Sequence, residues 1–268
     1  MYLLLLCFGG LAGITTVLFG FGGGFVIVPL LYTVLTGAHG ADTGVGHAAM
    51  QIAVATSTCV MIFGAAMATL RHHRAGTLQW NDVRPLAGYI ALGAIFGAVA
   101  AVSLSSDWVR WAFVIYLAIT ILDAILRPGF MHTVASEMRP MRRSATATVG
   151  VLIGSIAALL GVGGSVMTVP LMRRRGASMT AATAMANPLS LPMAAAGTAT
   201  YVLLAWNDAP LGAWYAGYVD LRAFLVLVAG SWIGIRMASP LIGRIPDALH
   251  AKVYLFLLTA VLVVMVVA

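Results

Sequence analysis

Apolar residues fill most of the chain in eight long runs that are separated by short polar connections. The runs cover residues 2–36, 47–70, 85–104, 108–126, 145–172, 180–206, 220–238 and 248–268. A helix needs about 20 apolar residues to cross the hydrocarbon core of a bilayer, so most runs can cross once. The pattern predicts an all-α integral membrane protein, a polytopic helix bundle that forms a single membrane domain over residues 1–268.

The composition leads to the same fold class. Hydrophobic residues make up 61% of the chain and charged residues 9%, with a mean hydropathy of +0.99. Soluble domains contain about 25% charged residues, so lipid must surround most of these side chains. Cys7 and Cys59 lie inside apolar runs, where we expect them to act as small hydrophobic residues and not as a disulfide or a metal pair.

Two of the runs are interrupted by glycines in nearly the same way. The first contains LFGFGGGFVIVPLL at residues 18–31, and the second contains LLGVGGSVMTVPLM at residues 159–172. The run 145–172 is long for one crossing and short for two. It predicts a hairpin of two short helices that meet partway through the bilayer near Gly161. The arms of the run 2–36 are longer, so two complete crossings remain an alternative there.

The positions of the basic residues predict the topology. Of the 15 lysines and arginines, only Arg110 and Arg222 fall in alternate connections, and the rest gather in the other connections. Basic connections face the cytoplasm, so we expect a multi-pass protein of the inner (cytoplasmic) membrane with a cytoplasmic linker at residues 127–144. The cluster Arg173–Arg175 is cytoplasmic only if the run 145–172 returns to the side on which it started. The two halves would then have inverted topology.

The two halves also share sequence. A shift of 141 residues overlays Gly13–Leu30 on Gly154–Leu171 with eight of 18 positions identical. Asp82 and Asp220 match further on, as do Gly93-x-x-x-Gly97 and Gly230-x-x-x-Gly234. We expect repeat one at residues 1–126 and repeat two at 145–268. Inverted repeats of this size are the architecture of secondary transporters, whose binding sites lie at interrupted helices near the midplane.

The glycine breaks are the candidate binding site. A break frees backbone groups that cost several kcal/mol in lipid unless protein or a polar cavity satisfies them. The start of a helix offers free N–H groups and the positive end of the helix dipole, which together favour an anion. The candidate substrate-binding residues are the two breaks and the polar side chains expected to face them: Gly22, Gly23, Gly24, Thr56, Ser57, Gly163, Gly164, Ser165 and Asn187. For the Gly93/Gly97 and Gly230/Gly234 pairs we expect only close helix packing.

The remaining polar residues suggest structural roles. His47 and Asp123 are expected at the membrane interface, the His72-His73 pair in a cytoplasmic loop, and Asp82/Arg84 and Asp220/Arg222 as helix caps or anchors. Asn187-Pro188 is expected to interrupt its helix. The sequence contains no catalytic triad, paired carboxylates or zinc signature, so no enzymatic activity, cofactor or metal is expected. The scattered arginines do not form a patch for nucleic acid. A homodimer is consistent with the small bundle, but no residue selects it.

The repeated motif GFGGGFVIVPLL and GVGGSVMTVPLM, the first followed by AVATS and the second by a degenerate copy, resembles the sulfite exporter TauE/SafE family. The resemblance implies transport of sulfite, organosulfonates or related sulfur-containing anions. Ser165 and Asn187-Pro188 depart from the family pattern, which leaves the substrate open. The leading hypothesis is a secondary transporter that moves a small anion by alternating access. A channel-like anion pore and a non-transporting membrane scaffold or receptor are the alternatives.

Overall fold

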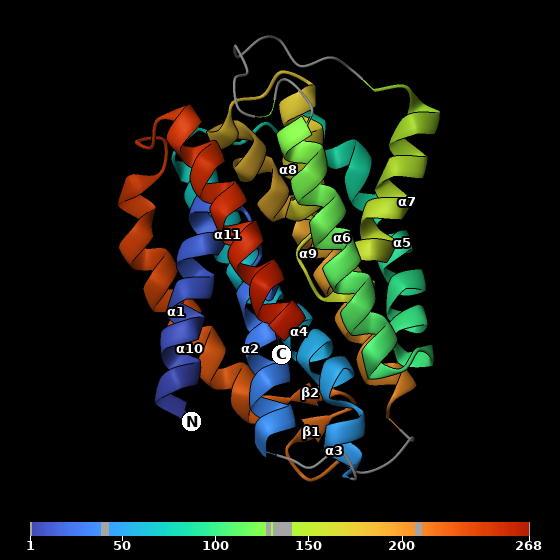
Figure 1. Cartoon of the computed structure of the whole chain (residues 1–268). Coiled ribbons are helices and arrows are strands. Elements are labelled where there is room, and N and C mark those ends of the chain that lie inside the picture. The colour runs from blue at the N-terminus through green and yellow to red at the C-terminus, as the bar shows by residue number, and fades with distance from the viewer. Residues whose placement is uncertain (1, 39–42, 127–129, 131–140, 207–210, 268) are drawn as a thin grey trace.

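The computed structural model describes residues 2–38, 43–126, 130, 141–206 and 211–267, which form a bundle of long helices (Figure 1). The helices are α1 (Tyr2–Phe19), α2 (Gly24–Ala38), α3 (Gly44–His47), α4 (Ala49–Arg74), α5 (Trp80–Ser103), α6 (Ser106–Leu126), α7 (Arg143–Leu160), α8 (Ser165–Arg174), α9 (Met179–Leu204), α10 (Leu221–Ala238) and α11 (Asp247–Val267), with a 3₁₀ turn at Ser239–Leu241. Two short antiparallel strands, β1 (Tyr215–Ala216) and β2 (Val219–Asp220), lie between α9 and α10.

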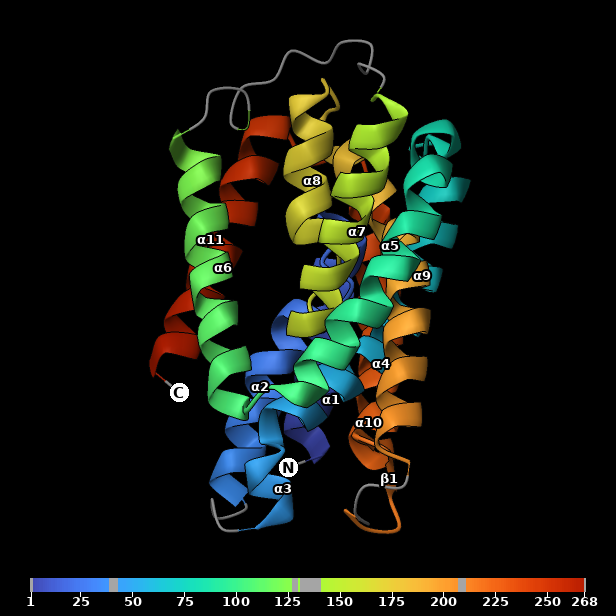
Figure 2. The ribbon, with the colours of Figure 1, turned by 90° about the vertical axis from the view of Figure 1, so that its right-hand side faces the viewer.

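Seven helices of the described residues are long and apolar enough to cross a bilayer, which confirms the predicted fold class. They are α1, α4, α5, α6, α7, α11 and α10, the last taken together with the 3₁₀ turn. Large apolar side chains such as Phe96 on α5, Ile119 on α6 and Phe256 on α11 are exposed on the outside of the bundle. Lipid covers such side chains in a membrane protein, and α6 and α11 lie side by side on this lipid-facing surface (Figures 1 and 2).

Two helix pairs approach each other closely at glycines, as predicted. On α5 and α7, a side chain at Gly97 would collide with the backbone of Ser155, and one at Gly154 with the backbone of Ile90. On α1 and α10, side chains at Gly13 and Gly234 would collide with the facing backbone in the same way. Glycine permits this contact because it has no Cβ. The first helix of each half therefore packs against a helix of the other half.

Both glycine breaks are present. Helix α1 ends at Phe19 and α2 begins at Gly24, while α7 ends at Leu160 and α8 begins at Ser165. The first break turns through left-handed backbone at Gly20, Gly22 and Gly23, and the second through Gly161. Figure 1 shows the α1–α2 hairpin opening at the lower end of the bundle and the α7–α8 hairpin opening at the upper end.

Helix α9 corrects one expectation from the sequence. It continues without interruption through Asn187 and Pro188 to Leu204. A proline inside a helix removes one N–H donor and usually bends the helix. Here Asn187 Nδ2 donates to Thr183 O at 3.2 Å within the same helix, and the surrounding residues are fully buried. Packing on all sides therefore holds the helix together across the proline.

The basic connections meet at one end of the bundle. Arg173 pairs with Asp247 at the start of α11, Arg174 with Asp123 near the end of α6, and Arg175 with Asp82 at the start of α5. A surface cavity of about 540 Å³ joins the ends of α4 and α10 and is lined by Arg71, Arg74 and Arg236. Most of the predicted linker 127–144 lies outside the described residues.

Candidate functional site

The two glycine breaks touch each other in the centre of the bundle. An added Cβ on Gly22 would lie 3.5 Å from Gly163 Cα, and one on Gly163 would lie 2.8 Å from Phe21 O. An added Cβ on Gly24 would overlap the carbonyl oxygen of Gly161. Segments 141 residues apart in the sequence therefore cross backbone to backbone, which only glycine permits at these positions.

The break amides are buried without partners. In the described part of the chain, no hydrogen bond is donated by the backbone amides of residues 22–24 or 163–165. All six residues are buried. Buried N–H groups are nearly always paired, and a buried helix end without partners is unusual. The two breaks thus gather a group of unused hydrogen-bond donors at the point where they cross.

The three predicted polar side chains are fully buried but have different surroundings. Ser57 Oγ lies against the second break, where it donates to Gly161 O at 3.1 Å. Asn187 donates to its own helix, and its Oδ1 has no partner among the described residues. Thr56 Oγ1 accepts from Asp220 N at 2.9 Å. The structure therefore places Ser57 at the breaks and Thr56 at a neighbouring contact.

Other side chains also lie around the breaks. The Met61 side chain fills the space beside Gly22 and Gly24, and Ser190 Oγ lies beside Gly163. Phe21 stacks between Phe25 and Tyr254, with ring centroids 4.4 and 4.8 Å apart. Methionine is apolar and flexible, so it can fill an irregular space and leave it again. In runs that are apolar throughout, no sequence signal separates the apolar residues of a site from their neighbours.

Two histidines cap the broken end of α1, which corrects the expected position of His72. His72 lies on α4, 1% exposed, and its Nε2 bonds Val17 O at 2.8 Å. His250 on α11 is 3% exposed, and its Nε2 bonds Leu18 O at 2.7 Å. The last carbonyls of a helix need partners from outside it. Helix α4 simply extends beyond the apolar run, so His72 is inside the bundle and not in a loop.

The broken end of α7 is capped by hydroxyl groups. Tyr201 on α9 donates its OH to Ala158 O at 2.8 Å, and Ser57 on α4 donates to Gly161 O. Ala158 stands at the position of Val17 when the chain is shifted by 141 residues. Equivalent carbonyls at the two breaks are therefore capped by an imidazole in one half and by a phenol in the other.

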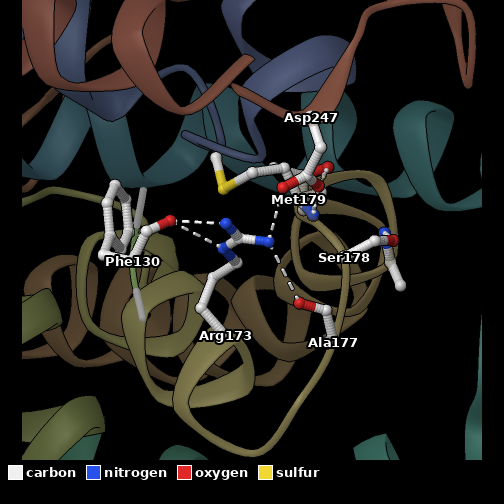
Figure 3. A network of polar contacts seen from close by, with 8 residues as sticks. Phe130, Arg173, Ala177, Ser178, Met179 and Asp247 are labelled. Atoms are coloured by element: carbon white, nitrogen blue, oxygen red, sulfur yellow. Dashed lines mark hydrogen bonds and ion pairs between the residues drawn. The ribbon is translucent and has the colours of Figure 1, made fainter. Parts of the chain in front are cut away.

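A buried arginine fixes the end of α8 (Figure 3). The Arg173 side chain is 0% exposed and its Nη1 lies 2.8 Å from Asp247 Oδ2. Its other donors reach the carbonyls of Phe130 and Ala177. Asp247 Oδ1 also accepts from Met179 N at 2.6 Å. One side chain thus ties α8 to the starts of α9 and α11 on the basic side of the breaks.

The opposite side of the breaks is covered by the connection before α10. Asp220 caps α10 by accepting from the amides of Arg222 and Ala223, which confirms its expected role as a helix cap. Its own amide donates to Thr56 on α4. Val219 beside it is 2% exposed. The strand segment therefore packs into the bundle. It contacts α4 at Thr56, the residue next to Ser57.

The breaks are buried in this conformation. Five cavities among the described residues are each lined by residues other than the glycines of the two breaks. Within these same residues, no group of three or more His, Cys, Asp or Glu side chains is placed to hold a metal ion. The arrangement offers buried amide donors and neutral side chains, which can bind an anion.

Comparison with known proteins gives consistent matches along the chain. A family model described as sulfite exporter TauE/SafE matches residues 5–265. A probable membrane transporter protein of Haemophilus influenzae is 26% identical over 262 residues, covering 97% of this chain and 96% of that protein. The probable membrane transporter protein YunE of Bacillus subtilis is 26% identical over 254 residues, with 89% and 87% covered. A Methanocaldococcus jannaschii relative of the same description is 26% identical over 170 residues, with 63% and 60% covered.

Proposed function

Because the chain belongs to the sulfite exporter TauE/SafE family, a family of membrane transporters, we propose that it is a secondary transporter for a small sulfur-containing anion such as sulfite or an organosulfonate. Seven helices of the described residues that are long and apolar enough to cross a membrane, together with the transporter relatives, support this class. The observation that carries the proposal is the group of unpaired, buried amides where the two breaks cross.

These amides suit an oxyanion or a sulfonate. Each such ligand presents several oxygen acceptors around one sulfur atom, and each break presents several N–H groups at the start of a helix. The helix dipoles of α2 and α8 add partial positive charge at the same place. These donors are neutral and need no cationic side chain beside them. Neutral donors bind an anion less tightly than a cation does, so the anion can also be released. Ser57 on α4 stands next to this group.

The closed conformation fits one step of alternating access. The strand segment at Asp220 seals one side, and the Arg173–Asp247 pair and the two histidines lie toward the other side. The opposite openings of the two hairpins in Figure 1 support inverted halves that rock against each other. Movement of either seal would expose the same amides to one side only.

The alternatives lead to different expectations. A channel-like pore needs a continuous path in its open state, whereas the breaks here are in direct contact. A scaffold or receptor without a transported ligand is consistent with breaks that pack without a cavity, but it gives no reason for six buried amides without partners. Those amides are costly in every state in which nothing binds them, so transport explains them best.

We also propose the orientation and the surroundings. The basic end would face the cytoplasm of an inner membrane, with the lipid bilayer and the anion as the partners of a protein that binds no nucleic acid. A chain without Cys7 and Cys59, carrying a new cysteine at Arg244 or at Asp107, tests this. Both positions are exposed, at the basic end and the opposite end. A membrane-impermeant maleimide should label Asp107→Cys in intact cells; labelling of Arg244→Cys instead would contradict the orientation.

Transport is tested in liposomes that contain the purified protein. Radiolabelled sulfite and a radiolabelled short alkyl sulfonate should enter with saturable kinetics and show counterflow when unlabelled anion is trapped inside. The variants Gly23→Leu and Gly164→Leu should lose both. Flux linear in concentration would indicate a pore, and absence of flux and of binding for every sulfur oxyanion would favour the scaffold. Undiminished flux in both variants would exclude the glycine breaks as the site.

A further inference from the structure

The broken end of α1 is built around an imidazole that can hold a second proton. His72 Nε2 bonds a carbonyl, Val17 O, so this nitrogen must carry a hydrogen. The other nitrogen, Nδ1, lies 2.8 Å from Thr77 Oγ1. The same hydroxyl lies 3.2 Å from His72 O, with geometry for donation. Thr77 therefore stands between two groups of one residue, and it has only one hydrogen to give.

The hydrogen-bond inventory favours the protonated ring. With neutral His72, the Thr77 hydroxyl can donate either to Nδ1 or to the carbonyl of His72, which also accepts from Thr77 N at 3.1 Å, and one of the two hydroxyl contacts is not used. With a proton on Nδ1, that nitrogen donates to Thr77 Oγ1 and the hydroxyl donates to His72 O. All three contacts, at Val17, Thr77 and His72 O, are then used at once. A positive charge is also favourable at the C-terminal end of a helix such as α1.

His250 cannot play the same part in this conformation. Its Nε2–H is committed to Leu18 O, and its Nδ1 has no partner among the described residues. A proton on that nitrogen would create a buried N–H without an acceptor, which is costly. The two histidines are close enough to repel each other when both are charged. The pair therefore accepts one proton, and the hydrogen bonds assign it to His72.

The groups around His72 and His250 act in opposite directions on a bound proton. The titratable and charged groups on the helices that carry or adjoin the two rings are His250, Asp247 and Tyr254 on α11, Arg173 on α8, Arg236 on α10, and Arg71 and Arg74 on the helix of His72 itself. At His250, the carboxylate of Asp247 favours a positive charge and Arg173 opposes it. At His72, burial opposes the charge, whereas the hydrogen bond to Val17 O and the carbonyl end of α1 favour it. Opposing effects of this kind allow a ring to bind a proton and to release it.

The site has a short route to water on the basic side. His72 and His250 line a cavity of about 10 Å³ together with Thr180, Thr183 and Ile242, which is room for about one water molecule. Ile242 also lines the cavity of about 540 Å³ between Arg71, Arg74 and Arg236. The two cavities thus meet at Ile242, on the side of the breaks where the basic connections lie.

From this geometry we propose that His72 is a proton-binding site of the transporter. The proton enters from the basic side, past the side chain of Ile242 that lines both cavities. The proton adds to Nδ1 as a simple acid–base step in which no bond other than N–H forms or breaks. In the transport cycle, a role that rests on the proposed function, the bound proton offsets the charge of the anion at the breaks. Its loss weakens the cap on Val17 O and so favours movement of α1.

Nitrogen NMR on histidine-labelled protein in lipid nanodiscs tests proton binding without any substrate. The His72 signal is assigned by its absence in His72→Gln, a variant whose amide can still donate to Val17 O. We expect this signal to change from the neutral form with hydrogen on Nε2 to the doubly protonated form as the pH falls from about 8 to 5. A His72 ring that stays neutral throughout this range while the protein is folded would overturn the proposal.

Two further variants keep the test specific. His73→Gln removes the exposed neighbour on the same helix and should leave the His72 signal unchanged. Thr77→Val removes the hydroxyl that bonds Nδ1 and should reduce the protonated fraction of His72 at a given pH. An unchanged fraction in Thr77→Val would contradict the hydrogen-bond argument.

Flux measurements then test coupling. In liposomes, a pH gradient should accelerate anion flux by wild type and His73→Gln, and this acceleration should be lost in His72→Gln while counterflow persists. Equal acceleration in all three proteins would overturn the coupling role. If wild type moves none of the anions, the proposed function fails, and the NMR titration still decides whether His72 binds a proton.

Discussion

The two helix hairpins share their glycines but differ in what holds them in place. At the first break, the carbonyls of Val17 and Leu18 are capped by His72 and His250. At the second break, the equivalent carbonyl of Ala158 is capped by the hydroxyl of Tyr201. An imidazole gains or loses charge near neutral pH, whereas phenols and alcohols stay neutral there.

The ends of the hairpins differ as well. Helix α8 ends after 10 residues in the buried Arg173 network, while α2 continues for 15 residues. On α2, the Tyr32 ring contacts the guanidinium of Arg110, whose centre lies 5.7 Å from the ring centroid. This difference indicates that the duplicated motif sets the position of both breaks. The side chains that stabilise each hairpin differ between the two halves. We expect pH to act on the first hairpin and charge pairing to hold the second.

The largest effect is expected from the arginine that holds the second hairpin. Arg173→Gln removes a fully buried charge and leaves Asp247 Oδ2 and the carbonyls of Phe130 and Ala177 without its donors, while Asp247 Oδ1 keeps the amide of Met179. Loss of the pair and of the charge-assisted hydrogen bonds should lower the free energy of unfolding by about 3 kcal/mol. Arg174→Gln is the matched control, because its pair with Asp123 is partly exposed and should cost about 1 kcal/mol or less. Chemical denaturation in detergent measures both; equal losses would show that the network does not hold α8.

The next effect separates a glycine at the crossing from a glycine beside it by their tolerance for a methyl group. Gly24→Ala places Cβ on the carbonyl oxygen of Gly161, so the crossing must open. We expect a loss of about 1–3 kcal/mol and of transport. Gly164→Ala meets only the Ile153 side chain at 3.2 Å and has an ordinary helical backbone, so its stability should change little. Thermal unfolding and flux in liposomes measure both variants. Equal stability of the two would contradict the backbone contact between the breaks.

The glycine breaks were predictable from the sequence because their signal is local. Glycine at several adjacent positions, a run of unsuitable length and a second copy all lie within short stretches of chain. The caps were not predictable, because His72 and Tyr201 lie 55 and 43 residues from the carbonyls they cap. One signal was available for His72: the helical run that ends at Leu70 continues without a breaker to Arg74. The interruption expected at Asn187 failed because burial of α9 outweighs the local effect of Pro188.

A smaller effect is expected at the contact that joins the halves. Ser57→Ala leaves Gly161 O without its donor, because Ser57 is its only partner in the described part of the chain. The unfolding free energy should fall by about 1–2 kcal/mol. Thr58→Val is the matched control, since Thr58 donates to Val54 O on its own helix, which already has a backbone partner. Denaturation of both variants gives the comparison. A larger loss in Thr58→Val would mean that the contact between the halves contributes little.

The smallest effect tests whether the second break is insensitive to pH. Tyr201→Phe removes the phenol cap on Ala158 O, but Gly161 N still donates to this carbonyl at 3.3 Å. The loss of stability should therefore be about 1 kcal/mol. Because no titrating group is removed, the ratio of anion flux at about pH 6 to that at about pH 8 should equal the wild-type ratio. In His72→Gln, the flux at the two pH values should become equal. A changed ratio in Tyr201→Phe would mean that both hairpins respond to protons and that their caps are equivalent in function.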